Sequence, residues 1–392
     1  MSEVVLNDIC ELIVDCPHST AYDEGTGYPL VRTPNIGRGR IIYSGMHRVC
    51  EEVYNKRNAR AIPQTNDLIF AREATAGNVA LIQEGEKVCL GQRTVLIRPN
   101  ANLVNPAFLT YHLLAPEQQY KLLSTANGAT VAHVNMPTIR NLKLSLPPLA
   151  TQHRIATILS RYDSLIENYQ KQIKLLEEAA QRLYKEWFVD LHFPGHENAM
   201  IVDGVPEGWE KKPISQLGEY LNGFAFKPSD WQKSGKPIIK IKEMGNGVSN
   251  DTPRNNGERV PGKYLVKAGD LLFSWSATLM VIVWSGEEGW LNQHLFKVTP
   301  SKGIEREFLL QSISNTIEEF QNLTTGSTMK HIQRNKLDQV FVNVPNDEIM
   351  KRYSSIAEKE RTEILHLSSQ IRLLTEARDR LLPKLMIGEM AV

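Results

Sequence analysis

Apolar residues recur every three or four positions over residues 155–187, a spacing typical of one face of a long helix. Counting in sevens gives one set at Ile155, Tyr162, Tyr169, Leu176 and Leu183, and a second at Leu159, Ile166, Ile173, Ala180 and Trp187. All ten positions are apolar, and most residues between them are charged or polar. This pattern predicts a heptad seam that packs against a partner helix.

The same spacing recurs near the end of the chain. The corresponding sets are Tyr353, Glu360, Leu367, Leu374 and Leu381, and Ala357, Ile364, Ile371, Arg378 and Leu385, of which eight are apolar. Two amphipathic helices that each pack on their own domain are the alternative. A seam this long and narrow favours a partner helix.

The connection between the two helices indicates how they pair. Each helix has some 35 residues and is therefore roughly 50 Å long. A parallel pair would require the linker between Asp190 and Trp209 to run back along the whole helix, close to its extended limit of about 60 Å. We therefore expect an antiparallel coiled coil, in which Tyr162 meets Arg378 in a cation–π contact and Ala180 meets Glu360.

The chain is an internal duplication. Gly128–His133 matches Gly326–His331 at an offset of 198, and this offset holds without a gap along both helical segments. Upstream the offset rises step by step to 208, as short loop insertions would produce. We expect a globular domain over residues 1–149, a long helix over 150–192, a second domain over 193–344 and a C-terminal helix over 345–392.

Short apolar runs between turn residues fill each globular part. The runs that predict strands are residues 31–36, 41–42, 68–70, 79–82 and 95–97 in the first domain, and 238–241, 271–275, 280–284 and 295–298 in the second. Residues 106–123 and 305–323 predict one helix in each domain. The predicted fold class is α+β, with two pseudo-twofold-related domains separated by two long helices that form an antiparallel coiled coil.

Composition excludes several classes of protein. Lys plus Arg number 45 against 44 Asp plus Glu, which excludes a histone-like basic chain but not local DNA-binding patches. The N-terminus lacks a secretory signal, and the run Leu279–Trp284 is far shorter than the roughly 20 residues of a membrane helix, so we expect a soluble, cytoplasmic protein. Cys10, Cys16, Cys50 and Cys89 fit no zinc spacing, and we expect buried small side chains and no metal site.

Basic residues interleave with the turns, where recognition residues usually lie. Arg and Lys are the commonest readers of guanine edges and of phosphates. The candidate DNA-binding residues are Arg32, Arg38, Arg40, Arg72, Arg93, Thr130 and His133 in the first domain, and Lys240, Lys242, Arg254, Thr328, Lys330 and His331 in the second. The alternative is an ordinary solvated surface. Trp275 and His294 occupy the positions of Arg72 and Arg93, so the two domains would read different sequences.

Catalytic motifs are missing from the sequence. We find no phosphate-binding G-x-x-x-x-G-K-[ST] loop, no amino-methyltransferase [N/D]-P-P-[FYW] motif, no H-E-x-x-H and no G-x-S-x-G. Asp67 and Glu73 resemble a nuclease carboxylate pair, but no Lys follows at the required spacing. We therefore expect no catalytic residues in this chain.

Over its whole length the sequence resembles the specificity (S) subunit of Type I restriction-modification enzymes. The resemblance rests on the order Gly-x-Thr, Leu-x-Leu-x-x-Pro-Pro and Gln-x-x-Ile between Gly128 and Ile155, repeated more loosely between Gly326 and Tyr353, and on Val205–Trp209. In the second copy Asn346 replaces the second proline and Met350 replaces the glutamine.

The resemblance implies a subunit that does no chemistry. Each target-recognition domain would bind half of a bipartite asymmetric site in double-stranded DNA, and the helices would fix the spacer and dock two modification (M) subunits. Those subunits would carry S-adenosylmethionine and methylate adenine, and restriction (R) subunits would add ATP- and Mg-dependent cleavage. The rival classes are a methyltransferase or nuclease in its own right, and a coiled-coil scaffold with no DNA partner.

Overall fold

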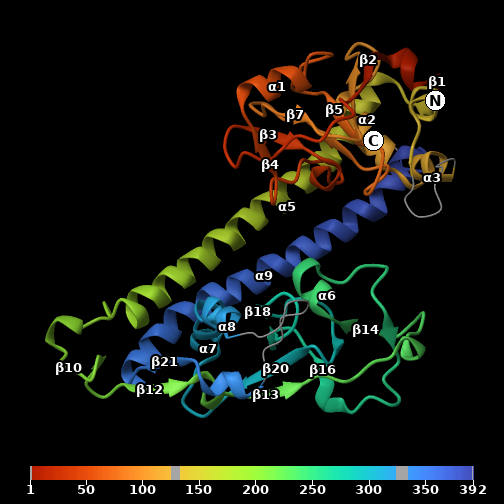
Figure 1. The fold of residues 1–392 in the computed structure, drawn as a ribbon. Coiled ribbons are helices and arrows are strands. Elements are labelled where there is room, and N and C mark those ends of the chain that lie inside the picture. Colours follow the sequence, from red (N-terminus) through yellow and green to blue (C-terminus); the bar gives the residue numbers. More distant parts are fainter. Residues whose placement is uncertain (1, 125–132, 324–333, 391) are drawn as a thin grey trace. The chain divides into compact units, whose positions relative to one another are not determined.

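The computed structural model describes residues 2–124, 133–323, 334–390 and 392. Contacts divide the chain into two compact units, one of residues 1–166 with 374–392 and one of residues 167–373 (Figure 1). We call them unit 1 and unit 2. The division falls inside the two long helices, whereas the predicted boundaries set each helix apart from the domain before it.

Unit 1 is built on two small sheets. The first is antiparallel in the order β2 (Cys10–Asp15), β8 (Thr94–Pro99), β5 (Leu68–Ala71) and β6 (Val79–Leu81). Side chains alternate across it: Phe70 and Val95 pack toward α2 (Pro106–Leu114), and Ile69 and Leu96 pack toward the second sheet. Because both faces are buried, its strands read as continuous apolar runs. The second sheet has the order β4 (His47–Val49), β3 (Tyr28–Val31) and β7 (Cys89–Leu90).

Unit 2 repeats this arrangement. Its first sheet has the order β13 (Gly218–Asn222), β20 (Leu295–Pro300), β17 (Leu271–Ser274) and β18 (Met280–Val283). Its second sheet has the order β15 (Arg254–Asn255), β14 (Lys236–Ile239), β19 (Gly289–Leu291) and β16 (Leu265–Val266). The parallel pair Ile238↔Trp290 corresponds to Leu30↔Cys89 in unit 1. The α+β class and the duplication are thus confirmed.

Each domain closes at the point where its long helix starts. Strand β1 (Ser2–Val5) pairs with β9 (Lys143–Leu146), and β12 (Glu210–Pro213) pairs with β21 (Phe341–Val344). Other short elements include α1 (Glu51–Arg57), α4 (Met136–Arg140), α6 (Ile241–Asn246) and the hairpin of β10 (Ile201–Val202) with β11 (Val205–Pro206). The start of each domain is therefore tied to the strand that leads into a helix.

The long helices are α5 (Leu149–Tyr184), extended by a π-helical turn over Lys185–Val189, and α9 (Asp347–Met386). In unit 1, Leu382 and Leu385 near the end of α9 share a core with Ile155 near the start of α5. In unit 2, Trp187 after α5 contacts Tyr353 near the start of α9, with ring centroids 6.0 Å apart. Within each unit the helices therefore run antiparallel, as predicted.

The register of the helix pair differs from the prediction. Arg378 does not lie over the ring of Tyr162; its guanidinium donates to Asp163 at 2.6 Å and to Asp379 at 2.8 Å. A carboxylate in reach binds an arginine more strongly than an aromatic face does. If the repeat offset of 198 is applied to the Asp163–Arg378 pair, it predicts Arg361 opposite Ala180 in place of Glu360.

Several element boundaries predicted from sequence are also wrong. The strand expected over 31–36 ends at Val31, because the Thr33–Asn35 segment with Pro34 forms a 3₁₀ turn, and Ile41 makes only an isolated bridge to Ile36. The helix expected over 106–123 divides into α2 and α3 (Pro116–Ser124), since proline cannot continue a helix in its interior. The helix expected over 305–323 likewise divides into α7 (Arg306–Asn315) and α8 (Ile317–Asn322).

Candidate nucleic-acid interface

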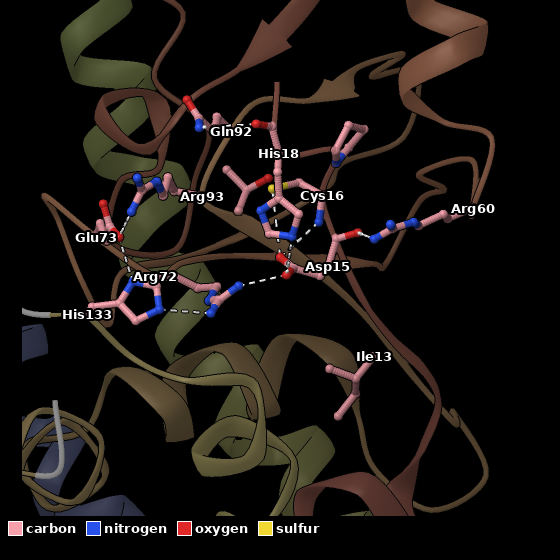
Figure 2. Close-up of polar contacts among 12 residues, drawn as sticks. Ile13, Asp15, Cys16, His18, Arg60, Arg72, Glu73, Gln92, Arg93 and His133 are labelled. Atoms are coloured by element: carbon pink, nitrogen blue, oxygen red, sulfur yellow. Dashed lines mark hydrogen bonds and ion pairs between the residues drawn. The ribbon is translucent and has the colours of Figure 1, made fainter. Parts of the chain in front are cut away.

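A cluster of charged side chains lies at one end of the first sheet of unit 1 (Figure 2). It joins Asp15 at the end of β2, Arg72 directly after β5, Arg93 directly before β8 and His133 from a distant segment. The N–H of Arg72 donates to the carbonyl of Arg93 at 3.0 Å. Antiparallel pairing of neighbouring strands thus brings residues 15, 72 and 93 to the same end of the sheet.

Arg72 organises this cluster from the inside. Its guanidinium donates to the carbonyl of Val134 at 2.9 Å, to the Asp15 carboxylate at 2.7 Å and to Nε2 of His133 at 2.9 Å. The residue is only 8 % exposed. We expected a direct DNA contact from Arg72, but this burial favours a positioning role.

Glu73 joins the two outer members of the cluster. Its carboxylate forms an ion pair with Arg93 and lies 2.6 Å from Nδ1 of His133. Since Arg72 donates to Nε2, the ring proton of His133 resides on Nδ1. Burial, with the positive charges of Arg72 and Arg93, lowers the pKa of His133, which keeps the ring neutral. The Arg93 side chain is 47 % exposed and is the most accessible guanidinium of the cluster.

The corresponding end of the first sheet of unit 2 carries side chains of a different chemical kind. The N–H of Trp275 donates to the carbonyl of His294 at 3.4 Å, which reproduces the backbone contact between Arg72 and Arg93. The indole N–H of Trp275 donates to the Asn222 amide oxygen at 3.2 Å, and its ring centroid lies 5.7 Å from that of His294. The same backbone arrangement therefore carries a network of arginines and acids in unit 1, and an aromatic ring bonded to an amide in unit 2.

Three of the predicted arginines occupy other places in unit 1. Arg38 donates to the carbonyl of Leu114 at 3.0 Å, in the field of Asp379 on α9. Gly39, between Arg38 and Arg40, lies beside the Asp163 carboxylate on α5. Arg32 donates to the carbonyl of Gly45. The loop 38–40 thus borders the long helices α5 and α9.

The predicted residues of unit 2 are also dispersed. The ammonium of Lys240 lies 4.3 Å from the Trp231 ring centroid, and Lys242 is exposed. Arg254 donates to the carbonyl of Gly235 and forms an ion pair with Glu287 at 3.0 Å. Four further candidates, Thr130, Thr328, Lys330 and His331, lie outside the described residues.

Sequence reasoning missed two features of these surfaces. The first is Asp15, which accepts a hydrogen bond from Arg72 and ends the apolar run of β2. An acidic residue at the end of an apolar run was the sequence signal that could have indicated this site. Tyr22 is 83 % exposed, and with Lys56 and Arg60 it lines a hollow of about 470 Å³ in unit 1. An exposed aromatic beside cations suits stacking on bases and pairing with phosphates, but no periodicity marks it.

All four cysteines lie in unit 1. Burial raises the pKa of Cys10 to about 12 and that of Cys89 to about 11, so both stay protonated. Cys16 is buried as expected, whereas Cys50 is exposed, contrary to expectation. Within the described ranges no three His, Cys, Asp or Glu side chains gather as a metal site would require. No helix among the described residues is long and apolar enough to cross a membrane.

Comparison with known proteins identifies the family. The Type I restriction modification DNA specificity domain matches residues 1–178 and again residues 206–374, so the chain belongs to this family of specificity proteins and carries two target-recognition domains.

Relatives and a solved structure agree with this assignment. The chain is 24 % identical over 410 residues to the MjaIX specificity subunit of Methanocaldococcus jannaschii, covering 99 % of this chain and 93 % of that protein. It is 26 % identical over 369 residues to the HindI specificity subunit of Haemophilus influenzae, covering 75 % and 80 %. A crystal structure of the Type I S subunit from M. genitalium has the same fold, with a TM-score of 0.55 and 14 % identity over 98 % of this chain and 96 % of that one.

Proposed function

We propose that this chain recognises a bipartite, asymmetric DNA sequence through its two target-recognition domains. One observation carries the proposal. The backbones of Arg72 and Arg93 in unit 1 make the same hydrogen bond as those of Trp275 and His294 in unit 2, but the side chains at these positions differ in chemistry. Two domains that carry different side chains at equivalent positions of the sheet would read different bases. Arg93 suits bidentate pairing with a guanine edge, whereas Trp275 and His294 suit apolar and single hydrogen-bond contacts.

The proposed role of the long helices is to set the distance between the half-sites and to bind partner subunits. The partners are two M subunits, which hold S-adenosylmethionine and methylate adenine, and R subunits, which use ATP and Mg²⁺ to restrict DNA. The chain itself then supplies recognition and no catalysis.

The rival functions predict different behaviour. A methyltransferase or nuclease would act on DNA without partners, and a coiled-coil scaffold would bind no DNA. The purified chain with its M subunits is incubated with random-sequence duplexes, and bound DNA is separated and sequenced. Two short motifs with a fixed gap are the expected result, with binding that weakens steeply as salt rises. Bound DNA in which no motif is enriched would overturn the proposal, as would methylation or cleavage of DNA by the chain alone.

A further inference from the structure

Each recognition domain has a long connection that leads from its first sheet to its second. In unit 1 it covers residues 16–27, between β2 and β3, and in unit 2 it covers residues 223–235, between β13 and β14. Each connection carries one large aromatic side chain that faces solvent: Tyr22 is 83 % exposed and Trp231 is 47 % exposed. The repeat offset of 208 takes Tyr22 to Asp230, the residue before Trp231. The two aromatics therefore occupy nearly the same position of the duplicated fold.

The backbone just after each aromatic is anchored in the same way. The N–H of Glu24 donates to the carbonyl of Arg48 on β4 at 2.9 Å, and the N–H of Gln232 donates to the carbonyl of Arg254 on β15 at 2.8 Å. The offset of 208 relates Glu24 to Gln232. Strands β4 and β15 each pair with the strand that follows the connection. Both aromatics thus precede an equivalent backbone hydrogen bond.

An arginine fixes the end of each connection. The Arg48 guanidinium donates to the carbonyl of Gly27 at 2.7 Å, and that of Arg254 donates to the carbonyl of Gly235 at 2.9 Å. Both glycines have a positive φ, and a Cβ on either would collide with a carbonyl oxygen of the neighbouring strand. Each connection is therefore held at two equivalent points, while its aromatic side chain projects into solvent.

Cations lie beside both aromatics. Tyr22 lines a hollow of about 470 Å³ in unit 1. The charged residues that line this hollow are three cations and one acid: Lys56, Arg57, Arg60 and Glu24. In unit 2 the ammonium of Lys240 lies 4.3 Å from the ring centroid of Trp231. An aromatic ring beside cations suits a ligand that combines a flat base with a phosphate, as a nucleotide does.

Each connection starts at the end of the sheet that carries the candidate DNA-binding residues. In unit 1 the preceding residue is Asp15, whose carboxylate accepts from Arg72 at 2.7 Å and whose carbonyl accepts from Arg60 at 3.0 Å (Figure 2). In unit 2 it is Asn222, whose amide oxygen accepts from the indole N–H of Trp275 at 3.2 Å. The exposed aromatic of each domain therefore lies on a loop that leaves directly from these residues.

Methylation of adenine requires a change in the DNA. Enzymes that act on a base within a duplex extrude the target nucleotide from the stack. The extruded base leaves a gap, where the neighbouring bases and the unpaired partner have lost a stacking surface. Apolar side chains insert between bases in other protein–DNA complexes, and an aromatic ring stacks favourably on every base. An exposed aromatic on an anchored backbone suits this gap, because little freedom is lost when it inserts.

We propose that Tyr22 and Trp231 are the side chains with which this chain fills the gap, one in each half-site. The ligand of each aromatic is an unstacked nucleobase beside the extruded adenine, and Lys56, Arg60 and Lys240 pair with the flanking phosphates. The chain then stabilises the extruded state in addition to choosing the sequence. This inference rests on the proposed function, because it requires M subunits that methylate an adenine in each half-site.

The test observes base extrusion at each half-site separately. The selected motif and the methylated positions identify the target adenine of each half. Two duplexes then carry 2-aminopurine, an adenine analogue whose fluorescence is quenched by stacking, in place of one target adenine or the other. The wild-type chain with its M subunits should raise the fluorescence of both duplexes. At saturation Tyr22→Ala should lose the rise with one duplex only, and Trp231→Ala with the other only.

Methylation of natural DNA gives a second readout. Loss of one stacking contact should slow methylation of the affected half-site by about 5- to 150-fold. An abasic residue opposite the target adenine lowers the cost of extrusion, so it should restore most of the rate to the alanine variant. Tyr22→Phe, which keeps the flat ring, should behave as the wild type. Rescue by the abasic residue separates stabilisation of the extruded base from a contact that only binds DNA.

Two control variants remove aromatics of matched exposure outside the connections. Tyr120→Ala removes a ring that is 75 % exposed in unit 1, and Phe341→Ala removes one that is 46 % exposed in unit 2. Both should keep the wild-type fluorescence rise and methylation rates. Because all four rings are exposed, the urea midpoints of unfolding should differ little among these variants.

The outcomes separate this inference from the proposed function. If the wild-type complex selects no motif, both are overturned. If it selects a motif but Tyr22→Ala and Trp231→Ala keep the full fluorescence rise in both half-sites, only the present inference is overturned. The same follows if either variant lowers the rise in both half-sites equally, or if its slow methylation is not rescued by the abasic residue.

Discussion

The N–H of Arg72 donates to the carbonyl of Arg93, yet the two guanidinium groups lie in different surroundings. The Arg72 side chain is 10 % exposed and is held by Asp15, whereas that of Arg93 is 47 % exposed. Removing one partner of a buried ion pair costs about 3 kcal/mol or more, and an exposed pair contributes less than about 1 kcal/mol. Arg72→Met should therefore lower the urea midpoint of unfolding clearly, and Arg93→Met should change it little. Equal urea midpoints for the two variants would contradict the positioning role of Arg72.

His112 predicts a pH dependence of stability. The ring is buried beside Met386 and stacks on Phe108, and burial lowers its pKa from 6.5 to about 4. The unfolded chain then binds the proton more readily than the folded one. The stabilisation is fully present above about pH 6.5 and is lost as the pH falls toward 4, with a total on the order of 3 kcal/mol.

The variant His112→Phe keeps an aromatic ring and removes the titration. Its free energy of unfolding should fall less steeply than that of the wild type between pH 6.5 and 4, measured by denaturant unfolding at a series of pH values. Carboxylates titrate in the same range in both proteins, so the difference between the two curves isolates His112. Parallel curves would show that the buried ring does not resist protonation.

The length of the helix pair predicts the spacer of the DNA site. Seven residues inserted after Gln172 and seven after Gln370 keep the heptad seam and lengthen both helices by about 10 Å. That length corresponds to about three base pairs at roughly 3.4 Å each. In the complex with M subunits, the gap between methylated half-sites should grow while their bases stay the same. An unchanged gap, or altered half-site bases, would show that the helices do not set the spacing.

The sequence was most informative where one periodic pattern covered many residues. The heptads that start at Ile155 and at Tyr353 predicted both long helices and their pairing, because an apolar seam requires a partner. The short linker between the first helix and the second domain predicted the antiparallel direction. The register was missed by one residue, since the pattern shows that Arg378 interrupts the seam but not that Asp163, next to Tyr162, is in reach.

The site was predicted less well, because turn residues follow no period. Arg38 and Arg72 both lie in connections between strands, yet Arg38 borders α9 and Arg72 is buried in the cluster of Figure 2. Their separation depends on which strands are neighbours, as in the order β2-β8-β5-β6. The equivalence of Arg93 and His294 was visible in sequence because the repeat fixes it.

The central claim, that each domain reads its own half of the DNA site, is tested most directly by sequencing methylated DNA after substitutions at equivalent positions. Arg93→Met and His294→Phe are introduced separately into the complex with M subunits. Each should relax the bases of one half-site only, at about 1–3 kcal/mol per lost base contact, and the two variants should affect opposite halves with the gap unchanged. If both substitutions altered the same half-site, or neither altered any base, the account would be contradicted.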